Sequence, residues 1–227
     1  MENLVLLHAF PFDSRMFDSV RADLSAAATM LTPDLALLAD DVVDAMDAAG
    51  MHRAVLGGVS MGGYVALALL RRHPERVKGL VLVDTRSGPD DAAAVERRQG
   101  VAARADGGDV ASGPDAIAPL VAAGSSDDIR ATLAAIADSV PAATIAWAQR
   151  AMAGRPDSTA VLAAASVPVL IVVGEDDAVT PPAAAHEMAA AARDAELVEL
   201  PGAGHLTPAE DPEGFAVVVL DWLSRRF

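Results

Sequence analysis

The sequence of 227 residues contains no cysteine, which excludes disulfide bonds, thiolate catalysis and cysteine-ligated metal sites. Lysine is almost absent as well, because Lys78 is the only one. The chain carries 17 basic and 32 acidic residues, for a formal net charge of −15. Phosphate binding needs clustered Lys and Arg, so this charge argues against nucleic acid as a partner and favours solubility as its role.

Long hydrophobic runs are also missing. No segment approaches the roughly 20 consecutive apolar residues of a membrane span. The opening stretch MENLVLLHAF has no basic region, and its apolar run is too short for a signal peptide. We therefore expect a cytoplasmic protein with no membrane partner. Apolar residues still make up 52% of the chain, which permits a sizeable core in one domain, or in one domain carrying an inserted cap.

Short apolar runs alternate with longer Ala- and Leu-rich stretches along the chain. Most runs are apolar on nearly every residue, as is typical of strands covered on both faces of a parallel sheet. The alternation predicts an α/β fold with a doubly wound, mostly parallel sheet of about six strands. The expected strands are Asn3–His8, Thr29–Pro33, Ala54–Val59, Gly79–Asp84, Val167–Val173 and Glu196–Leu200. The expected helices lie near Arg15–Ser25, Leu35–Ala49, Gly62–Arg72, Pro182–Ala192 and Pro212–Arg225.

The alternation stops between about Ser87 and Ala165, where Ala-rich helical patterns follow one another and no strand pattern is convincing. We interpret residues 87–165 as a helical cap inserted into a core formed by residues 1–86 and 166–227. Such insertions often form lids over active sites. The alternative is a set of surface helices packed on the sheet edge.

The segment VLGGVSMGGYVA, residues 55–66, contains a G-x-S-x-G pattern centred on Ser60. Glycine inside a strand or helix costs roughly 0.5–1 kcal/mol relative to alanine, so four glycines around one serine need a reason. The pattern lies where an expected strand runs into an expected helix, a setting in which a strained turn holds up a nucleophilic hydroxyl. We predict Ser60 as a nucleophile; the alternative is a glycine-rich turn.

A serine nucleophile needs a base, and the chain has five histidines. We favour His205, in the loop PGAGHLTP after the last expected strand, because that loop can reach the carboxyl edge of a parallel sheet. The alternative is an ordinary loop histidine. The others end the first strand (His8), lie in loops (His52, His73) or fall inside a helix (His186).

The base needs a carboxylate to fix its tautomer and stabilise the imidazolium. Three aspartates follow expected strands, and we rank them Asp177, then Asp84, then Asp176. Asp177 gives the chain order Ser, Asp, His. For Asp84 a helix cap or loop hydrogen bond is the favoured alternative.

Acyl transfer also needs donors for the developing oxyanion. The backbone N–H of Met61 is one candidate, and that of Phe10, in the loop after the first strand, is the other. Pro11 cannot donate. The alternative is an ordinary strand-to-helix connection.

Four segments together resemble the α/β-hydrolase superfamily over nearly the whole chain: HAFPFDSRMF, VLGGVSMGGYVALALLRRHPERVKGLVLVD, GEDDAVTPP and PGAGHLTPAEDPEGF. The general look is similar to small bacterial carboxylesterases and lactonases, including 3-oxoadipate enol-lactonase and the pimeloyl-carrier-protein methyl ester esterase. The resemblance implies Ser60 as nucleophile, Asp177 as acid, His205 as base, and Phe10 and Met61 as backbone donors.

Three features depart from the superfamily pattern. The loop after the first strand reads HAF where HG is usual, so Ala9 must tolerate the local backbone conformation. The leading antiparallel hairpin is missing, because the first expected strand starts at Asn3. The P-D-x-R-G-x-G-x-S loop is missing after Asp34, which casts doubt on any substrate inferred from relatives.

The resemblance implies a serine hydrolase that needs no metal or other cofactor and cleaves a small carboxylic ester or lactone through an acyl-enzyme. Serine at position 60 disfavours dehalogenase and epoxide hydrolase activity, since those relatives use aspartate there. Trp147 and Met152 are candidates for lining the substrate pocket; packing is the alternative. The substrate is expected to be a small molecule and the chain a monomer or homodimer. The acyl and alcohol groups, and the choice between ester and lactone, stay open.

Two other functions are considered. One is a hydroxynitrile-lyase-type enzyme on the same three residues; those relatives place a lysine near the base, whereas Lys78 precedes a strand here. The other is a non-catalytic ligand-binding protein, which would not require all three side chains.

Overall fold

One parallel sheet organises the computed structural model, which describes residues 1–34 and 39–227. The strands are β1 (Glu2–Leu7), β2 (Ala28–Leu31), β3 (Ala54–Val59), β4 (Val77–Val83), β5 (Val169–Gly174) and β6 (Ala195–Leu200). The sequence predicted all six, with bounds that differ by at most two residues. Every pairing between neighbouring strands is parallel. The expected fold class is confirmed.

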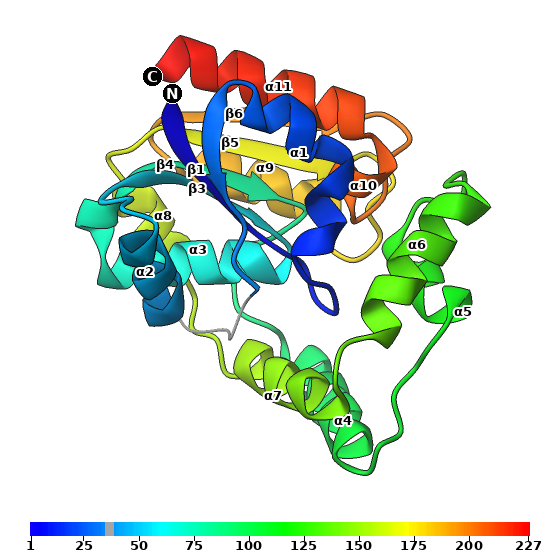
Figure 1. The fold of residues 1–227 in the computed structure, drawn as a ribbon. Helices are drawn as coiled ribbons and strands as arrows, with labels where there is room; N and C mark the ends of the chain where they lie inside the picture. Colours follow the sequence, from blue (N-terminus) through cyan, green and yellow to red (C-terminus); the bar gives the residue numbers. More distant parts are fainter. Residues whose placement is uncertain (35–38) are drawn as a thin grey trace.

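Helices cover both faces of this sheet (Figure 1). The α-helices are α1 (Asp18–Ser25), α2 (Ala39–Ala48), α3 (Met61–Arg72), α4 (Ala92–Asp106), α5 (Pro114–Ile117), α6 (Asp127–Asp138), α7 (Ala142–Ala153), α8 (Thr159–Ala164), α9 (Pro182–Ala191), α10 (Thr207–Glu210) and α11 (Pro212–Arg226). Short 3-10 turns are η1 (Ser14–Phe17), η2 (Pro74–Arg76) and η3 (Ala118–Leu120). The helix expected from Leu35 includes α2, but its first four residues and the loop directly after Asp34 lie outside the described residues.

The strand order β2-β1-β3-β4-β5-β6 contains one reversal point, between β1 and β3. In open α/β sheets, ligands bind in the crevice at the carboxyl ends of the strands where the order reverses. The loops that follow β1 and β3 therefore flank the place where a site is expected. Among the described residues, no antiparallel strand joins the sheet.

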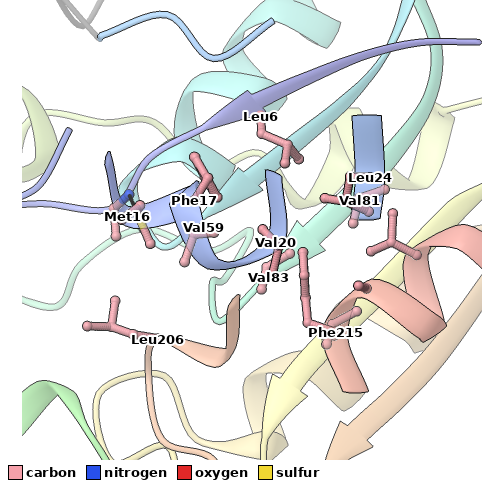
Figure 2. Close-up of a cluster of buried hydrophobic side chains, with 14 of the residues drawn as sticks. Leu6, Met16, Phe17, Val20, Leu24, Val59, Val81, Val83, Leu206 and Phe215 are labelled. Carbon is pink, nitrogen blue, oxygen red and sulfur yellow. Dashed lines mark hydrogen bonds between the residues drawn. The ribbon is translucent and has the colours of Figure 1, made fainter. Parts of the chain in front are cut away.

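Alternating strand residues build a separate apolar core on each face. On the face covered by α1 and α11, Phe17, Val20 and Phe215 pack against strand residues that include Leu6 and Val81 (Figure 2). The strand residues that alternate with these point to the other face of the sheet, where they pack against α2, α3, α8 and α9. They include Val5, Leu7, Leu80, Leu82, Ile171 and Val173. Burial on both faces explains why the strand sequences are continuously apolar.

The segment between β4 and β5 contains α4 to α8 and no strand. In Figure 1, α4 to α7 stand apart from the layers that cover the sheet. We call residues 92–153 the cap segment. Helix α8 also falls within the range expected for the cap, but Leu162 on it is fully buried in the core with α3 and α9.

Over the described residues, no single helix is both long and apolar enough to cross a bilayer; only α6 and α7 taken together satisfy the composition test, and they meet at 96°.

Candidate active site

Ser60 occupies a sharp turn between the last residue of β3 and the first of α3. Its φ is 51° and its ψ is −109°, a conformation that costs a non-glycine residue of order 1–3 kcal/mol. The flanking glycines make this turn sterically feasible. A Cβ on Gly58 would lie 2.2 Å from the carbonyl carbon of Gly62, and one on Gly62 would lie 2.1 Å from the carbonyl oxygen of Leu7. The glycines are thus required by close backbone approach around a raised hydroxyl.

A continuous chain of hydrogen bonds joins Ser60, His205 and Asp177. The Nε2 of His205 lies 2.8 Å from the Oγ of Ser60, and its Nδ1 lies 2.8 Å from Oδ2 of Asp177. A carboxylate only accepts, so Nδ1 carries the proton and Nε2 is free to accept the serine proton. The structure brings together the nucleophile, base and acid expected from the sequence.

Asp177 is buried and held in place by its own turn. Its Oδ1 accepts the backbone N–H groups of Val179 and Thr180, at 2.8 and 2.9 Å, and its Oδ2 accepts the Thr180 hydroxyl at 2.8 Å. Burial by itself would raise the pKa of Asp177, but His205 and then Thr180 more than offset this, and the pKa lies below its ordinary value. Asp177 therefore stays ionised beside the imidazole. Asp176, the third-ranked candidate, is exposed.

Asp84, the second-ranked carboxylate, is fully buried but makes different contacts. Its oxygens accept the backbone N–H of Gly174 at 3.0 Å, and the backbone N–H and hydroxyl of Thr207 at 2.9 Å each. Burial raises the pKa of Asp84 to about 7; the charge of His205 opposes this shift and that of Asp177 adds to it. The loop hydrogen bonds weighed as the alternative for this residue are what the structure shows.

Three of the four remaining histidines form hydrogen bonds away from Ser60, and the fourth, His52, is exposed. His73 lies 2.9 Å from Asp40, and His186 lies 2.8 Å from Glu199. His8 is buried at the end of β1, where burial lowers its pKa more than its hydrogen bond with the carbonyl of Ala9 raises it.

The two expected oxyanion donors lie at the two positions that flank the strand reversal. Met61 is the first residue of α3, so its N–H has no acceptor within the helix, and the helix N-terminus favours negative charge there. Phe10 follows β1 and lines the same cavity as Ser60 and His205. Ala9 stands where the superfamily usually has glycine, and its backbone does not need a positive φ. Of the described residues other than glycine, only Ser60 and Asp84 have a positive φ.

A cavity of about 420 Å³ opens between the core and the cap segment and is lined by Ser60 and His205. From α7 it receives Ile145, Gln149 and Met152, which share one helix face. Met152 thus lines the cavity, as expected. Trp147 does not: it lies two residues after Ile145, on another face of α7, and its side chain is 39% exposed.

Sequence reasoning missed two contributors. Thr180 bonds Asp177 through both its hydroxyl and its N–H, and an Asp followed three residues later by Thr is a recognisable local turn pattern. Arg86 lines the cavity from the loop after β4, and nothing in its sequence context marked it. Within residues 1–34 and 39–227, no group of three His, Asp or Glu could hold a metal ion.

Comparisons with known proteins match most of the chain. A family pattern described as alpha/beta hydrolase fold matches residues 25–212. The chain is 31% identical over 245 residues to the pimeloyl-[acyl-carrier protein] methyl ester esterase of Aromatoleum aromaticum, covering 96% of this chain and 97% of that protein. It is 42% identical over 66 residues to a protein named "Putative carbamate hydrolase RutD" from Caulobacter sp. strain K31. That match spans 29% of this chain and only 25% of the relative's length.

Solved structures are similar to this chain over nearly its whole length. A thermophilic esterase from Thermogutta terrifontis superposes with a TM-score of 0.91 at 32% identity, covering 99% of this chain and 90% of that chain. The enol-lactonase of Burkholderia xenovorans LB400 superposes with a TM-score of 0.85 at 24% identity, covering 98% of this chain and 91% of that chain. The second likeness shows the fold alone.

Proposed function

The chain belongs to the alpha/beta hydrolase family, and on this premise we propose that it is a serine hydrolase that cleaves a small carboxylic ester or lactone. The observation that carries the proposal is the hydrogen-bonded chain Ser60–His205–Asp177, whose serine end opens into a cavity. A turn strained at the nucleophile, a base in the required tautomer and a buried ionised acid are what acyl transfer needs.

The reaction proceeds in two steps. His205 Nε2 takes the proton of Ser60 while Oγ bonds to the substrate carbonyl carbon, and Asp177 stabilises the imidazolium. The N–H groups of Met61 and Phe10 stabilise the oxyanion; each donor contributes about 2.7–4 kcal/mol in comparable sites. His205 then protonates the leaving alcohol. In the second step, His205 takes a proton from water, which attacks the acyl-enzyme and releases the carboxylic acid and free Ser60. An ester gives an alcohol and an acid, whereas a lactone gives a single hydroxy acid.

Two relatives support an ester as substrate. The names of the Aromatoleum and Thermogutta proteins denote esterases. A lactone stays within the proposal because its cleavage uses the same acyl-transfer chemistry. The proposed substrate is a small molecule, and the proposed active form is a monomer or a homodimer.

The lyase alternative receives no support from the structure. Lys78 is the second residue of β4, at the amino end of the strand, and its amine pairs with Glu2. Ser60 and His205 lie at the carboxyl ends of the strands, so Lys78 cannot act beside the base.

The test is hydrolysis of p-nitrophenyl esters, from acetate to decanoate, and of simple lactones by base titration, with wild type and Ser60→Ala. We expect turnover by wild type and a loss of at least about a thousandfold in kcat in the variant. A fluorophosphonate should add one covalent mass to wild type and none to Ser60→Ala. Equal turnover by both proteins would refute the assignment of Ser60.

A further inference from the structure

Three arginines line the active-site cavity, and they differ in how their charges are compensated: Arg86, Arg98 and Arg104. The Nε of Arg98 lies 2.5 Å from a carboxylate oxygen of Asp90. The guanidinium of Arg104 lies 3.9 Å from the carboxylate of Asp109. Arg86 forms no ion pair with any of the described residues. It is therefore the one arginine on the wall of this cavity that has no ion pair within the described part of the chain.

Arg86 is fixed at a defined place beside the proposed nucleophile. The residue before it, Thr85, donates its hydroxyl to the carbonyl oxygen of Ser60 at 2.7 Å. The residue after it, Ser87, accepts the N–H of Ser158 at 2.9 Å. The guanidinium itself donates one hydrogen bond, from Nη2 to the carbonyl of Val179 at 2.9 Å. Val179 belongs to the turn of Asp177. The loop after β4 therefore contacts the nucleophile turn through Thr85 and the acid turn through Arg86.

The hydrogen-bonding capacity of this guanidinium is largely unused. Its Nε is buried and has no partner among the described residues, and the bond from Nη2 to Val179 is the only hydrogen bond that the guanidinium makes with them. A partly buried charge without a counter-charge is costly, and a guanidinium presents planar paired donors that match a carboxylate. The natural complement of Arg86 is an anion that arrives with the substrate.

The net charge of the chain determines what binding of an anion would need. At −15, the protein as a whole repels anions, so an anionic substrate requires a local cation in the cavity. Conversely, a neutral ester would leave Arg86 uncompensated in the bound complex, where water is displaced.

We propose that Arg86 binds a carboxylate of the substrate, so that the ester or lactone cleaved at Ser60 carries a second, anionic group that is not cleaved. This inference rests on the proposed function and names its substrate class. Carboxylates on the acyl part and on the alcohol part share this chemistry, and the experiment separates them.

The test compares esters that differ in one terminal group. On the acyl side, p-nitrophenyl hydrogen glutarate is matched to p-nitrophenyl valerate; on the alcohol side, the acetate of 4-hydroxybenzoate is matched to that of 4-methylphenol. We expect wild type to prefer the carboxylate in one pair. Arg86→Gln should lower kcat/KM for that carboxylate ester roughly 10- to 100-fold, mainly through KM, and change the neutral partner far less. Arg97→Gln, an equal charge change at an exposed position, is the control.

Binding without chemistry separates this inference from the proposed function. Glutarate titrated calorimetrically into Ser60→Ala should bind, and the affinity should fall at least about tenfold in Ser60→Ala/Arg86→Gln. If no ester is hydrolysed but glutarate binding depends on Arg86, the proposed function fails and the anion site stands. If wild type shows no preference in either pair, or if Arg86→Gln weakens both members of a pair equally, the inference is overturned. Equal glutarate affinity in the two variants would overturn it as well.

Discussion

Thr207 donates both its backbone N–H and its hydroxyl to one oxygen of Asp84, at 2.9 Å each. Thr207 follows the base His205 by two residues. The other oxygen of Asp84 accepts the N–H of Gly174, at the end of the strand that leads to Asp177. Asp84 thus ties the base loop to the acid strand and acts as a positioning residue.

The first prediction concerns this tie. Asp84→Asn keeps the shape of the side chain but presents an NH2 group where all three partners are donors, so at least one hydrogen bond is lost. We expect kcat to fall about tenfold and the free energy of unfolding to fall by about 1–3 kcal/mol. The measurements are ester hydrolysis well below the unfolding temperature, and urea unfolding.

Asp176→Asn supplies the matched control, because that aspartate is exposed. It should change neither quantity appreciably. If Asp84→Asn is as active as Asp176→Asn, the positioning role assigned to Asp84 is wrong.

The second prediction is a pH dependence of stability. Burial raises the pKa of Asp84 from 3.8 to about 7 in the folded chain. Between these values the native state holds a proton that the unfolded state has released, so this group favours folding at low pH and its contribution is lost as the pH rises toward 7. The stability of wild type minus that of Asp84→Asn should therefore decrease from about pH 4 to about pH 8. Denaturant unfolding across this range measures it, and a difference that grows with pH would contradict it.

Much of this site was predictable because its signals are local. Glycines are needed around Ser60 because β3 and α3 approach closely there. A G-x-S-x-G pattern in the sequence therefore predicts the turn directly. The position of His205 follows from the rule that parallel strands deliver their following loops to one edge. Both residues could be assigned before any coordinates were considered.

Other contributions depend on contacts between segments distant in sequence. Choosing between Asp177 and Asp84 needed the geometry of both loops, since each aspartate follows a strand and each is buried. The exclusion of Trp147 depended on the rotation of α7 relative to the cavity. Arg86 could be singled out only from the structure, because the sequence does not show that Arg98 has an acidic partner and Arg86 has none among the described residues.

The third prediction uses the strain at the nucleophile. Ser60 has a φ of 51°, where a side chain is disfavoured and glycine is not. We expect Ser60→Gly to be inactive yet more stable than Ser60→Ala, by about 1 kcal/mol, because only glycine relieves the backbone. Both variants lack the hydroxyl, and the unfolded-chain entropy of glycine by itself costs roughly 0.4–1 kcal/mol relative to alanine. A Ser60→Gly variant that is still the more stable one therefore shows strain larger than this cost. If Ser60→Gly were less stable than Ser60→Ala by the full entropy cost, the turn would be unstrained.

The last prediction concerns Glu210, which joins the cap segment to the base loop. Its Oε2 accepts the N–H of Ala122 at 2.7 Å and the hydroxyl of Ser125 at 2.6 Å, and its Oε1 accepts the N–H of Leu206 at 3.0 Å. Since Leu206 is adjacent to His205, movement of the cap at this point is coupled to the base. Glu210→Gln places a donor opposite donors and should reduce kcat several-fold.

Hydrogen exchange can separate the two arms of this contact. In Glu210→Gln, the NH2 group abolishes one of the two backbone hydrogen bonds and the loss of the charge weakens the other. The amides of Ala122 and Leu206 should therefore both exchange faster, to different extents. Ser125→Ala removes only the cap-side hydroxyl and leaves both backbone bonds, so Leu206 should keep its protection and kcat should stay within about twofold of wild type. If Glu210→Gln exposes Ala122 while Leu206 and kcat are unchanged, the glutamate anchors the cap without acting on the base. Loss of protection at both amides together with a lower kcat would identify the cap segment as a support for the catalytic histidine.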